Sequence, residues 1–318
     1  MTAPASRSSI AGALPAALAA LALLIAACTQ GAGNLGSVAP PPGSAEPSID
    51  IPSPEATPAS SEPAGSPAAS PGETTTVRVY YMLGSFTGDS GLVPVLRTVP
   101  KTQAVGRAAI EQLLAGPVDA ELAGRPAMYT GIPDGVRFLG LDIEGGGAVV
   151  DLSSEFDSGG TSATLAQRYA QVVYTLTQFP TVDRVRFLVN GNPTPAVVTG
   201  GAIDAQSPIT RGMYEDLLPA IWVDRPAWGG ALPSGTQVSG LANVFEAQFR
   251  MMVLDADGRA LSDRPVMATC GSGCLGTFDV QVAYQVSAAQ WGTLRVFEPS
   301  AKDGSPLHVV DYPVWLTP

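Results

Sequence analysis

The sequence predicts an α+β domain followed by an all-β sandwich, with a disordered N-terminal tether ahead of both. Three observations lead to this prediction. Residues 29–73 are dominated by Pro, Ser, Ala and Gly. Residues 74–199 alternate between strand-like and helix-like hydrophobic patterns, whereas residues 218–318 hold only short alternating stretches separated by turn residues. We therefore expect two folded domains, with a connector at 200–217.

The composition limits the chemistry that the chain can perform. Its 318 residues carry 17 basic and 28 acidic side chains, which gives a net charge of −11. An acidic chain without a basic patch is a poor partner for phosphate backbones, so we expect no nucleic-acid partner. One histidine and three cysteines leave too few nitrogen and sulfur ligands for a closed zinc site. We expect no catalytic residues, no metal, no cofactor and no enzymatic activity.

Residues 1–27 have the pattern of a signal peptide. Arg7 precedes an apolar run from Ile10 to Ala27 that is rich in Ala and Leu and short for a membrane span. The residues Leu24–Cys28 resemble the lipobox of bacterial lipoproteins, in which the cysteine is lipidated and the chain is cut just before it. This resemblance implies an extracytoplasmic chain anchored to the cell membrane through lipid on Cys28. An ordinary signal peptide, or a membrane anchor, with a chance cysteine is the alternative.

Residues 28–73 predict a lipidated, disordered linker. From Thr29 to Glu73 the chain has no Lys or Arg and few apolar side chains. Such a segment cannot bury enough apolar surface to offset the entropy lost on ordering. We expect it to act as a spacer between the membrane and the folded part.

Residues 74–199 predict five strands and two helices. The stretch Thr75–Met82 is β-branched, aromatic and alternating, which is typical of a strand. Apolar residues repeat at helical spacing between Thr102 and Leu114, and again after a cap at Thr161 or Ser162 as far as Phe179. The remaining predicted strands are 92–99, 136–143, 148–152 and 185–189. This order favours a small α+β layer with the helices on one face of a sheet.

Five runs of residues in this segment resemble the GerMN domain of sporulation and spore germination proteins. They are Gln112–Pro117, Ile132–Gly135, Ala148–Phe156, Tyr174–Pro180 and Val185–Gly191. The resemblance implies a non-enzymatic extracytoplasmic module with a fold similar to the ring-building domains of secretion and sporulation complexes. Similar domains also occur in bacteria that do not sporulate, so we do not infer germination from the family name.

Residues 218–318 predict about seven short strands, as in a β-sandwich. The expected strands begin with Ile221–Val223 and a long alternating stretch from Gln237 to Leu254, then continue at 266–269, 277–284, 293–298 and 307–316. This segment resembles the immunoglobulin-like domain found beside GerMN in germination-type lipoproteins. The matching runs are Val238–Glu246, Leu254–Gly258, Gly276–Phe278 and Leu294–Glu298.

Cys270 and Cys274 lie in a Gly/Ser loop that departs from this family pattern. Outside the cytoplasm such a pair should oxidise, and the neighbouring glycines allow a tight turn. We expect a structural disulfide, which contributes roughly 2 kcal/mol in the chain-entropy account. A redox-active thiol pair and a metal site are the alternatives, although the spacing is not that of C-x-x-C oxidoreductases.

Four further motifs have an ordinary structural interpretation. Gly88–Gly91 is similar to a serine-protease nucleophile loop, but no histidine precedes it, so we expect a turn. Asp255–Gly258 lacks the rest of a calcium loop, and we expect a hairpin turn there as well. His308 is expected at a solvent-facing or edge position of a strand. The four tryptophans all follow residue 217 and either fill the sandwich core or form a sugar-stacking platform; they are Trp222, Trp228, Trp291 and Trp315.

These observations favour an assembly or interaction scaffold at the cell envelope. Its expected partners are the membrane, through the lipid anchor, and either a second copy of the chain or an envelope protein. The alternative function is a module that binds a cell-wall polymer, carbohydrate or peptidoglycan, through the tryptophans.

Overall fold

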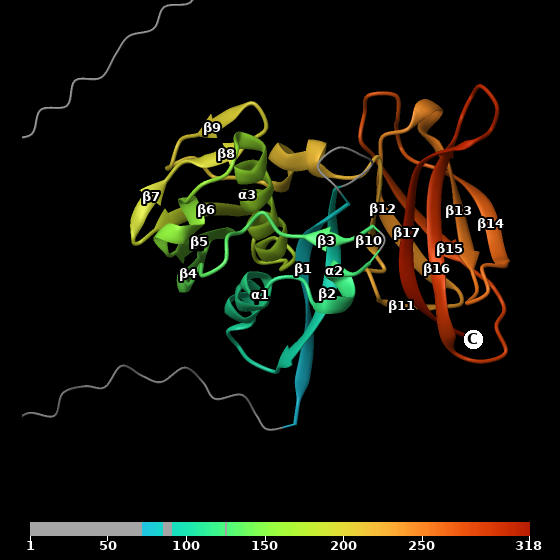
Figure 1. Ribbon diagram of the computed structural model, residues 1–318, viewed down its shortest axis with the longest axis horizontal. Helices are drawn as coiled ribbons and strands as arrows, with labels where there is room; N and C mark the ends of the chain where they lie inside the picture. The colour runs from blue at the N-terminus through green and yellow to red at the C-terminus, as the bar shows by residue number, and fades with distance from the viewer. Residues whose placement is uncertain (1–71, 85–90, 125) are drawn as a thin grey trace, which may run out of the picture. The chain divides into compact units, whose positions relative to one another are not determined.

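The computed structural model describes residues 72–84, 91–124 and 126–318 (Figure 1). The predicted signal peptide at 1–27, the lipidation site Cys28 and nearly all of the predicted linker at 28–73 lie outside the described residues. Most of the Gly88–Gly91 motif lies outside them too. Within the described part of the chain, no helix is long and apolar enough to cross a membrane.

The first sheet of the N-terminal domain is built around strand β1, Thr74–Leu83. β1 pairs along its whole length with the antiparallel strand β2, Gly91–Pro100. On its other edge β1 pairs only through Met82 and Leu83, with the short strand β3, Met128–Tyr129. The sheet order is therefore β2-β1-β3, and most of that second edge of β1 lies beyond the reach of β3.

A second sheet has the order β4-β5-β6-β7. Its strands are Phe138–Glu144, Gly147–Leu152, Arg184–Val189 and Asn192–Thr194. β5 and β6 run parallel, and the outer pairs are antiparallel. Gly145 and Gly146 take positive φ angles in the β4–β5 turn, as the sequence indicates. A separate hairpin follows, formed by β8, Ala196–Val198, and β9, Gly201–Ile203.

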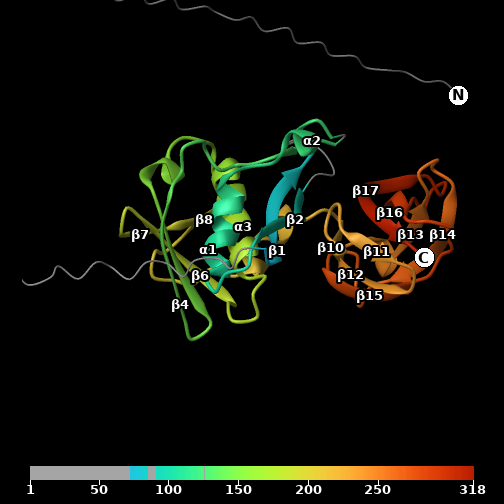
Figure 2. The ribbon, with the colours of Figure 1, turned by 90° about the horizontal axis from the view of Figure 1, so that it is seen from below.

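Helix α3, Ser162–Leu176, lies at the centre of this domain. The Thr161 hydroxyl caps it by accepting a hydrogen bond from the Thr164 amide at 3.2 Å, as predicted. Every residue from Ala166 to Leu176 is buried, because the helix contacts both β1 and β8, between which it lies in Figure 2. Helix α1, Val105–Leu114, packs against α3, β1 and β4, and the single-turn helix α2 spans Asp119–Leu122. The α+β class is confirmed, with the strands divided between separate sheets.

The C-terminal domain is a two-sheet sandwich, as predicted. One sheet has the order β10-β12-β15 and the other β11-β17-β16-β13-β14. The strands β10 to β17 are Ile221–Arg225, Ala231–Pro233, Thr236–Ala242, Gln248–Leu254, Ala260–Met267, Gly276–Val282, Gln290–Pro299 and Pro306–Thr317. Buried side chains from both sheets, among them Val238, Phe249 and Leu294, fill the space between them.

Several stretches differ from the sequence prediction; β14, for example, spans Ala260–Met267 where a strand was expected at 266–269. The long alternating stretch Gln237–Leu254 is two strands, because the short helix η3, Phe245–Ala247, interrupts it with positive φ angles at Glu246 and Ala247. The segment predicted as a connector, 200–217, holds β9 and the 3₁₀ helix η2, Arg211–Leu217. Tyr214 of η2 is fully buried, and its hydroxyl donates to the Val197 carbonyl at 2.9 Å. This part of the chain is therefore packed structure of the N-terminal domain.

Candidate functional site

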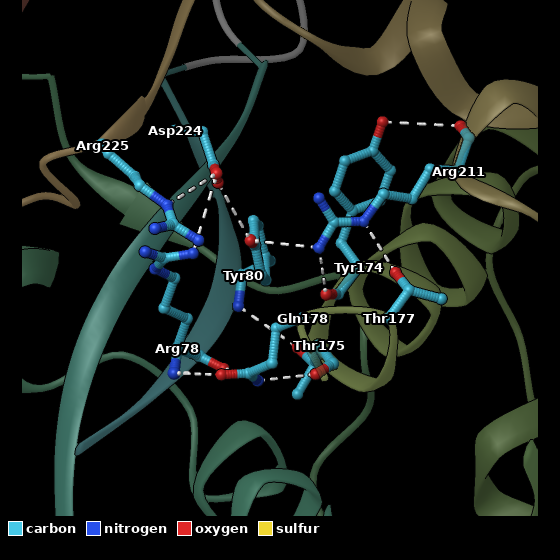
Figure 3. Close-up of polar contacts among 9 residues, drawn as sticks. All are labelled: Arg78, Tyr80, Tyr174, Thr175, Thr177, Gln178, Arg211, Asp224 and Arg225. Atoms are coloured by element: carbon cyan, nitrogen blue, oxygen red, sulfur yellow. Dashed lines mark hydrogen bonds and ion pairs between the residues drawn. The ribbon is translucent and has the colours of Figure 1, made fainter. Parts of the chain in front are cut away.

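A polar cluster between the two domains forms where β1, the end of α3, η2 and β10 meet (Figure 3). We call this cluster the domain joint. Its members are Arg78, Tyr80, Tyr174, Thr175, Thr177, Gln178, Arg211, Asp224 and Arg225. Both family-like segments contribute to it, and Arg211 comes from the stretch between them.

Arg211 binds three parts of the N-terminal domain. Its Nε donates to Thr177 Oγ1 at 2.7 Å, and its Nη2 donates to the Tyr174 carbonyl at 3.0 Å. The guanidinium carbon lies 4.6 Å from the ring centre of Tyr174 and 5.3 Å from that of Tyr80. A guanidinium against two aromatic faces gains cation–π attraction in addition to its hydrogen bonds. Arg211 therefore fixes η2 against α3 and β1.

Tyr80 and Asp224 carry this network across to the sandwich domain. Arg211 Nη2 donates to the Tyr80 hydroxyl at 3.3 Å, and that hydroxyl donates to Asp224 Oδ1 at 3.3 Å. Asp224 Oδ2 lies 3.6 Å from Arg78 Nη1, with both side chains about one-fifth exposed (22% and 21%), and 3.8 Å from Arg225 Nε. The Asp224 carboxylate of β10 thus contacts both the Tyr80 hydroxyl and the Arg78 guanidinium of β1.

Burial sets the protonation of the tyrosines in the joint. Desolvation raises the pKa of Tyr80 above its usual value, although the Arg211 charge acts in the opposite direction. Desolvation likewise raises the pKa of Tyr174. Both phenols therefore stay neutral at physiological pH, and each hydroxyl can both donate and accept. The cluster acts as a fixed chain of hydrogen bonds from Arg211 to Asp224.

Side chains of α3 complete the free edge of β1 next to this network. Gln178 accepts from the Arg78 amide at 2.7 Å and donates to the Arg78 carbonyl at 2.6 Å. Thr175 accepts from the Tyr80 amide at 3.3 Å, and Gln171 donates to the Tyr80 carbonyl at 2.9 Å. Thr175 and Gln171 are fully buried. Two α3 side chains and Gln178, in the turn after the helix, thus take the place of a neighbouring strand along the part of β1 that β3 does not reach.

Apolar contacts continue the joint. Trp222 of β10 is 3% exposed and packs edge-on against Tyr174, with ring centres 5.9 Å apart. Trp228 forms a bridge with Val95 of β2, and its amide donates to the Pro94 carbonyl at 2.9 Å. The buried side chains of the two domains consequently form one continuous hydrophobic cluster. The domains are held by both polar and apolar contacts.

The cysteine pair forms the predicted disulfide. Cys270 and Cys274 are joined, with their Cα atoms 5.7 Å apart, and the loop between them turns through positive φ angles at Ser272 and Gly273. The loop packs on the sandwich, since the Ser272 amide donates to the Val244 carbonyl at 2.8 Å. The bond closes a local loop of the sandwich.

The other motifs that the sequence singles out lie apart in the fold. Asp255 Oδ1 accepts from the amides of Asp257 and Arg259 at 2.9 and 2.8 Å, so its carboxylate stabilises the predicted hairpin turn. His308 lies on β17 with a positive φ of 52°, and its Nε2 is 4.0 Å from a Glu298 carboxylate oxygen. Among the described residues, no group of three or more His, Cys, Asp or Glu side chains could hold a metal ion.

The four tryptophans have separate surroundings. Trp222 is buried in the joint, and Trp228 packs on Tyr312 with ring centres 5.7 Å apart. Trp291 is 54% exposed and contacts Trp315 across β16 and β17, with ring centres 5.3 Å apart. Trp291 is the tryptophan with the most solvent-exposed surface among the four, while Trp228 and Trp315 are half-buried.

No pattern in the sequence indicates the joint. Tyr80 and Asp224 are 144 positions apart, and each has the appearance of an ordinary residue in an alternating strand. Arg211 lies in a segment predicted as a connector. The polar residues of α3 could have raised the question, because Gln171 and Thr175 lie in the buried C-terminal half of this helix.

Comparison with protein families supports the two domains. Residues 78–195 match the Germane family, described as sporulation and spore germination. Residues 220–305 match the Gmad2 family, described as the immunoglobulin-like domain of bacterial spore germination. The architecture is thus a tandem of two modules of the spore germination type. The chain carries a GerMN domain followed by this immunoglobulin-like domain, which confirms the resemblance seen in the sequence and supports a germination-related role.

Solved structures of GerMN domains are similar to parts of the chain. The first GerMN domain of the sporulation protein GerM from Bacillus subtilis has 22% identity and a TM-score of 0.34, covering 43% of this chain and 98% of that one. The tandem GerMN domains of the same protein have 16% identity and a TM-score of 0.36, covering 66% and 62%.

A Clostridium perfringens protein described as a candidate lipoprotein has 19% identity and a TM-score of 0.31, covering 45% of this chain and 92% of that one. A search of the curated proteins gave no match.

Proposed function

We propose that this chain is a non-enzymatic lipoprotein of the cell envelope that acts as a scaffold, presenting its two domains to partners in a fixed arrangement. The domain joint is the observation that carries this proposal. Separate binding modules on a flexible connector would need no such network, whereas a scaffold requires its surfaces to keep their relative positions. Lipidation at Cys28 would place the scaffold at the membrane surface, facing the extracytoplasmic side.

The proposal predicts that partner contacts depend on the joint. The full-length chain would be expressed in its host with a photo-crosslinking residue on each domain, and the crosslinked envelope proteins would be compared with those of an Arg211→Ala variant. We expect crosslinks from both domains in the unmodified chain and a changed pattern in the variant. Arg259→Ala is a matched control, because this arginine is 78% exposed and pairs only with Asp257 in the β13–β14 turn.

The scaffold proposal fails if neither domain crosslinks to any chain. It also fails if the Arg211→Ala variant, shown to be folded by circular dichroism, gives the same crosslinks as the Arg259→Ala control. The second result would mean that the fixed domain arrangement has no part in binding.

Binding of a cell-wall polymer is the second candidate function, and the Trp291–Trp315 pair favours it. Exposed aromatic rings stack well on sugar rings, and Trp291 leaves about half of its surface (54%) open. The test is co-sedimentation of the full-length chain with purified peptidoglycan. We expect the bound fraction to fall several-fold in Trp291→Ala and to be unchanged in Phe245→Ala, an equally exposed aromatic residue of η3 (55%). Equal binding by both variants would exclude this pair as the polymer site.

A further inference from the structure

Two sheet edges of the N-terminal domain differ in whether their backbone has hydrogen-bond partners. The edge of β1 beyond β3 is completed by the α3 side chains Gln171 and Thr175 and by Gln178 in the turn after α3. The outer edge of β4, by contrast, has β5 as its only partner strand in the described structure. Among the described hydrogen bonds, none outside the β4–β5 pairing uses the backbone of residues 138–144. An unpaired edge of this kind is a template for another strand.

Apolar side chains accompany this open edge. Leu139 and Ile143 of β4 are 44% and 40% exposed. A hollow of about 570 Å³ lies beside them, between β4 and the first turn of α1. Its apolar walls include Val105, Leu141 and Phe179. Natural edge strands are usually blunted by charges, short length or a bulge. In β4 the bulge lies at the start, between Phe138 and Gly140, and Asp142 and Glu144 line a separate pocket, so Leu141 and Ile143 remain an apolar stretch of the edge.

Helix α1 shapes the hollow by approaching β4 closely at Gly106. A Cβ atom at this position would lie 3.0 Å from Leu141 Cδ2 and 3.6 Å from Ile143 Cδ1. A larger residue would push these side chains outward and fill the hollow. The charged residues of β4, Asp142 and Glu144, instead line a separate pocket with Arg184 and Arg186. One face of the strand is therefore apolar and the other is charged.

We propose that β4 pairs antiparallel with β4 of a second copy of this chain, about a two-fold axis at Leu141. This inference rests on the proposed scaffold function and names one of its contact surfaces. In this register Leu141 lies opposite Leu141 of the second copy, and Ile143 lies opposite Leu139. Both exposed apolar residues of each copy are then covered, and both α1 hollows lie on the same face of the joined sheet.

Side-chain charge and apolar pairing favour this register over the two registers with the axis one residue away. With the axis at Leu141, Asp142 lies opposite Gly140, and no carboxylate faces another. Moving the axis to Asp142 would place that carboxylate opposite itself, which is unfavourable in a cross-strand pair. Moving it to Gly140 would leave Ile143 without an apolar partner. The bulge between Phe138 and Gly140 makes Leu139 an additional residue opposite β5.

Cysteine crosslinking in the full-length chain tests the pairing and its register. Directly opposed residues in an antiparallel pair have Cα atoms about 4.5–5.5 Å apart, within reach of a disulfide. Leu141→Cys should therefore form a covalent dimer under mild oxidation, because it lies opposite its own copy. Ile143→Cys is the matched control: its copies would be four positions out of register, about 13–14 Å apart along the strands, and should not crosslink. The native Cys270 and Cys274 are already joined to each other.

A second experiment uses other cysteine positions, so the pairing can still be tested if Leu141→Cys does not fold. Differently tagged copies carrying Leu139→Cys and Ile143→Cys, expressed together, should crosslink to each other at least tenfold more than either does to itself. Absence of crosslinks in both experiments overturns the pairing, as does equal dimer formation by Leu141→Cys and Ile143→Cys. If β4 crosslinks are absent while envelope partners are still captured through an intact joint, this inference fails and the scaffold function stands.

Discussion

Arg211→Ala is the most informative substitution in the domain joint, because this side chain contacts β1 and α3 and reaches Asp224 through Tyr80. It removes three hydrogen bonds, from Nε to Thr177 and from Nη2 to the Tyr174 carbonyl and the Tyr80 hydroxyl. It also removes a cation from two ring faces and leaves the Tyr80 hydroxyl without its donor. The expected result is loss of stability together with loss of coupling between the domains.

The size of the effect can be worked out from these contacts. Two cation–π contacts at a partly buried site contribute about 1 kcal/mol each. A hydrogen bond from a charged donor contributes about 1.5–3 kcal/mol, and the lower end applies to a half-buried side chain. Release of the arginine returns about 1.5–2 kcal/mol of side-chain entropy. Counting the two shorter hydrogen bonds at the lower end of this range, the net destabilisation of Arg211→Ala is about 3 kcal/mol.

Thermal and urea unfolding of the full-length chain would measure this effect. We expect the unmodified chain to unfold in one transition, because the two domains share one hydrophobic cluster. Arg211→Ala should lower the midpoint and broaden or split the transition, since coupling between the domains is reduced. Arg211→Lys keeps the charge but loses the planar donor geometry, so it should have an intermediate effect. A destabilisation below about 0.5 kcal/mol, the range of ordinary surface substitutions, with a single sharp transition would show that the joint does not couple the domains.

Three further predictions concern the folded core. Gly240→Ala should destabilise the sandwich by about 3 kcal/mol or more in urea unfolding, because a Cβ atom there would overlap the Trp222 carbonyl. Gly201→Ala is the control: a Cβ atom there would have no atom within 4 Å, so the free energy of unfolding should change little. Reduction of the Cys270–Cys274 bond should cost roughly 2 kcal/mol, measured with and without a reductant, and an unchanged midpoint would contradict this. Burial raises the pKa of Tyr81 from 10.0 to about 12, so this residue contributes stability that is complete below pH 10 and is lost as pH rises toward 12. Tyr81→Phe should therefore show a shallower alkaline loss of stability, and equal pH profiles would refute this assignment.

The sequence predicted the elements whose signals are local. Apolar spacing and the Thr161 cap identified α3, and the alternation of β1 and the glycine turn after β4 identified strands and a hairpin. Two cysteines four positions apart were enough to predict the disulfide. These features depend on neighbouring residues alone, so they could be recognised without knowing the fold.

Features that depend on distant residues were missed. The division of the N-terminal strands between two sheets and the packing of η2 depend on contacts that sequence periodicity does not carry. The break at η3 was hidden because residues on both sides of it continue the same alternation. The joint is the extreme case, since its central hydrogen bond joins Tyr80 and Asp224, which lie in different domains.

The polar residues of α3 show why the joint and the open edge of β4 belong to one argument. At helical spacing, Gln171, Thr175 and Gln178, which follows the end of α3, have the appearance of a solvated stripe, and a solvated stripe needs no partner. In the folded domain they hydrogen-bond the backbone of β1, because a buried strand edge without partners would cost several kcal/mol. The same physical requirement applies to β4, yet no described helix supplies polar side chains along its edge, and apolar residues are exposed beside it. Water can satisfy that backbone in the isolated chain, but it cannot cover Leu139 and Ile143. A second strand satisfies both needs at once, which is why we assign the β4 edge to assembly and the β1 edge to the internal joint.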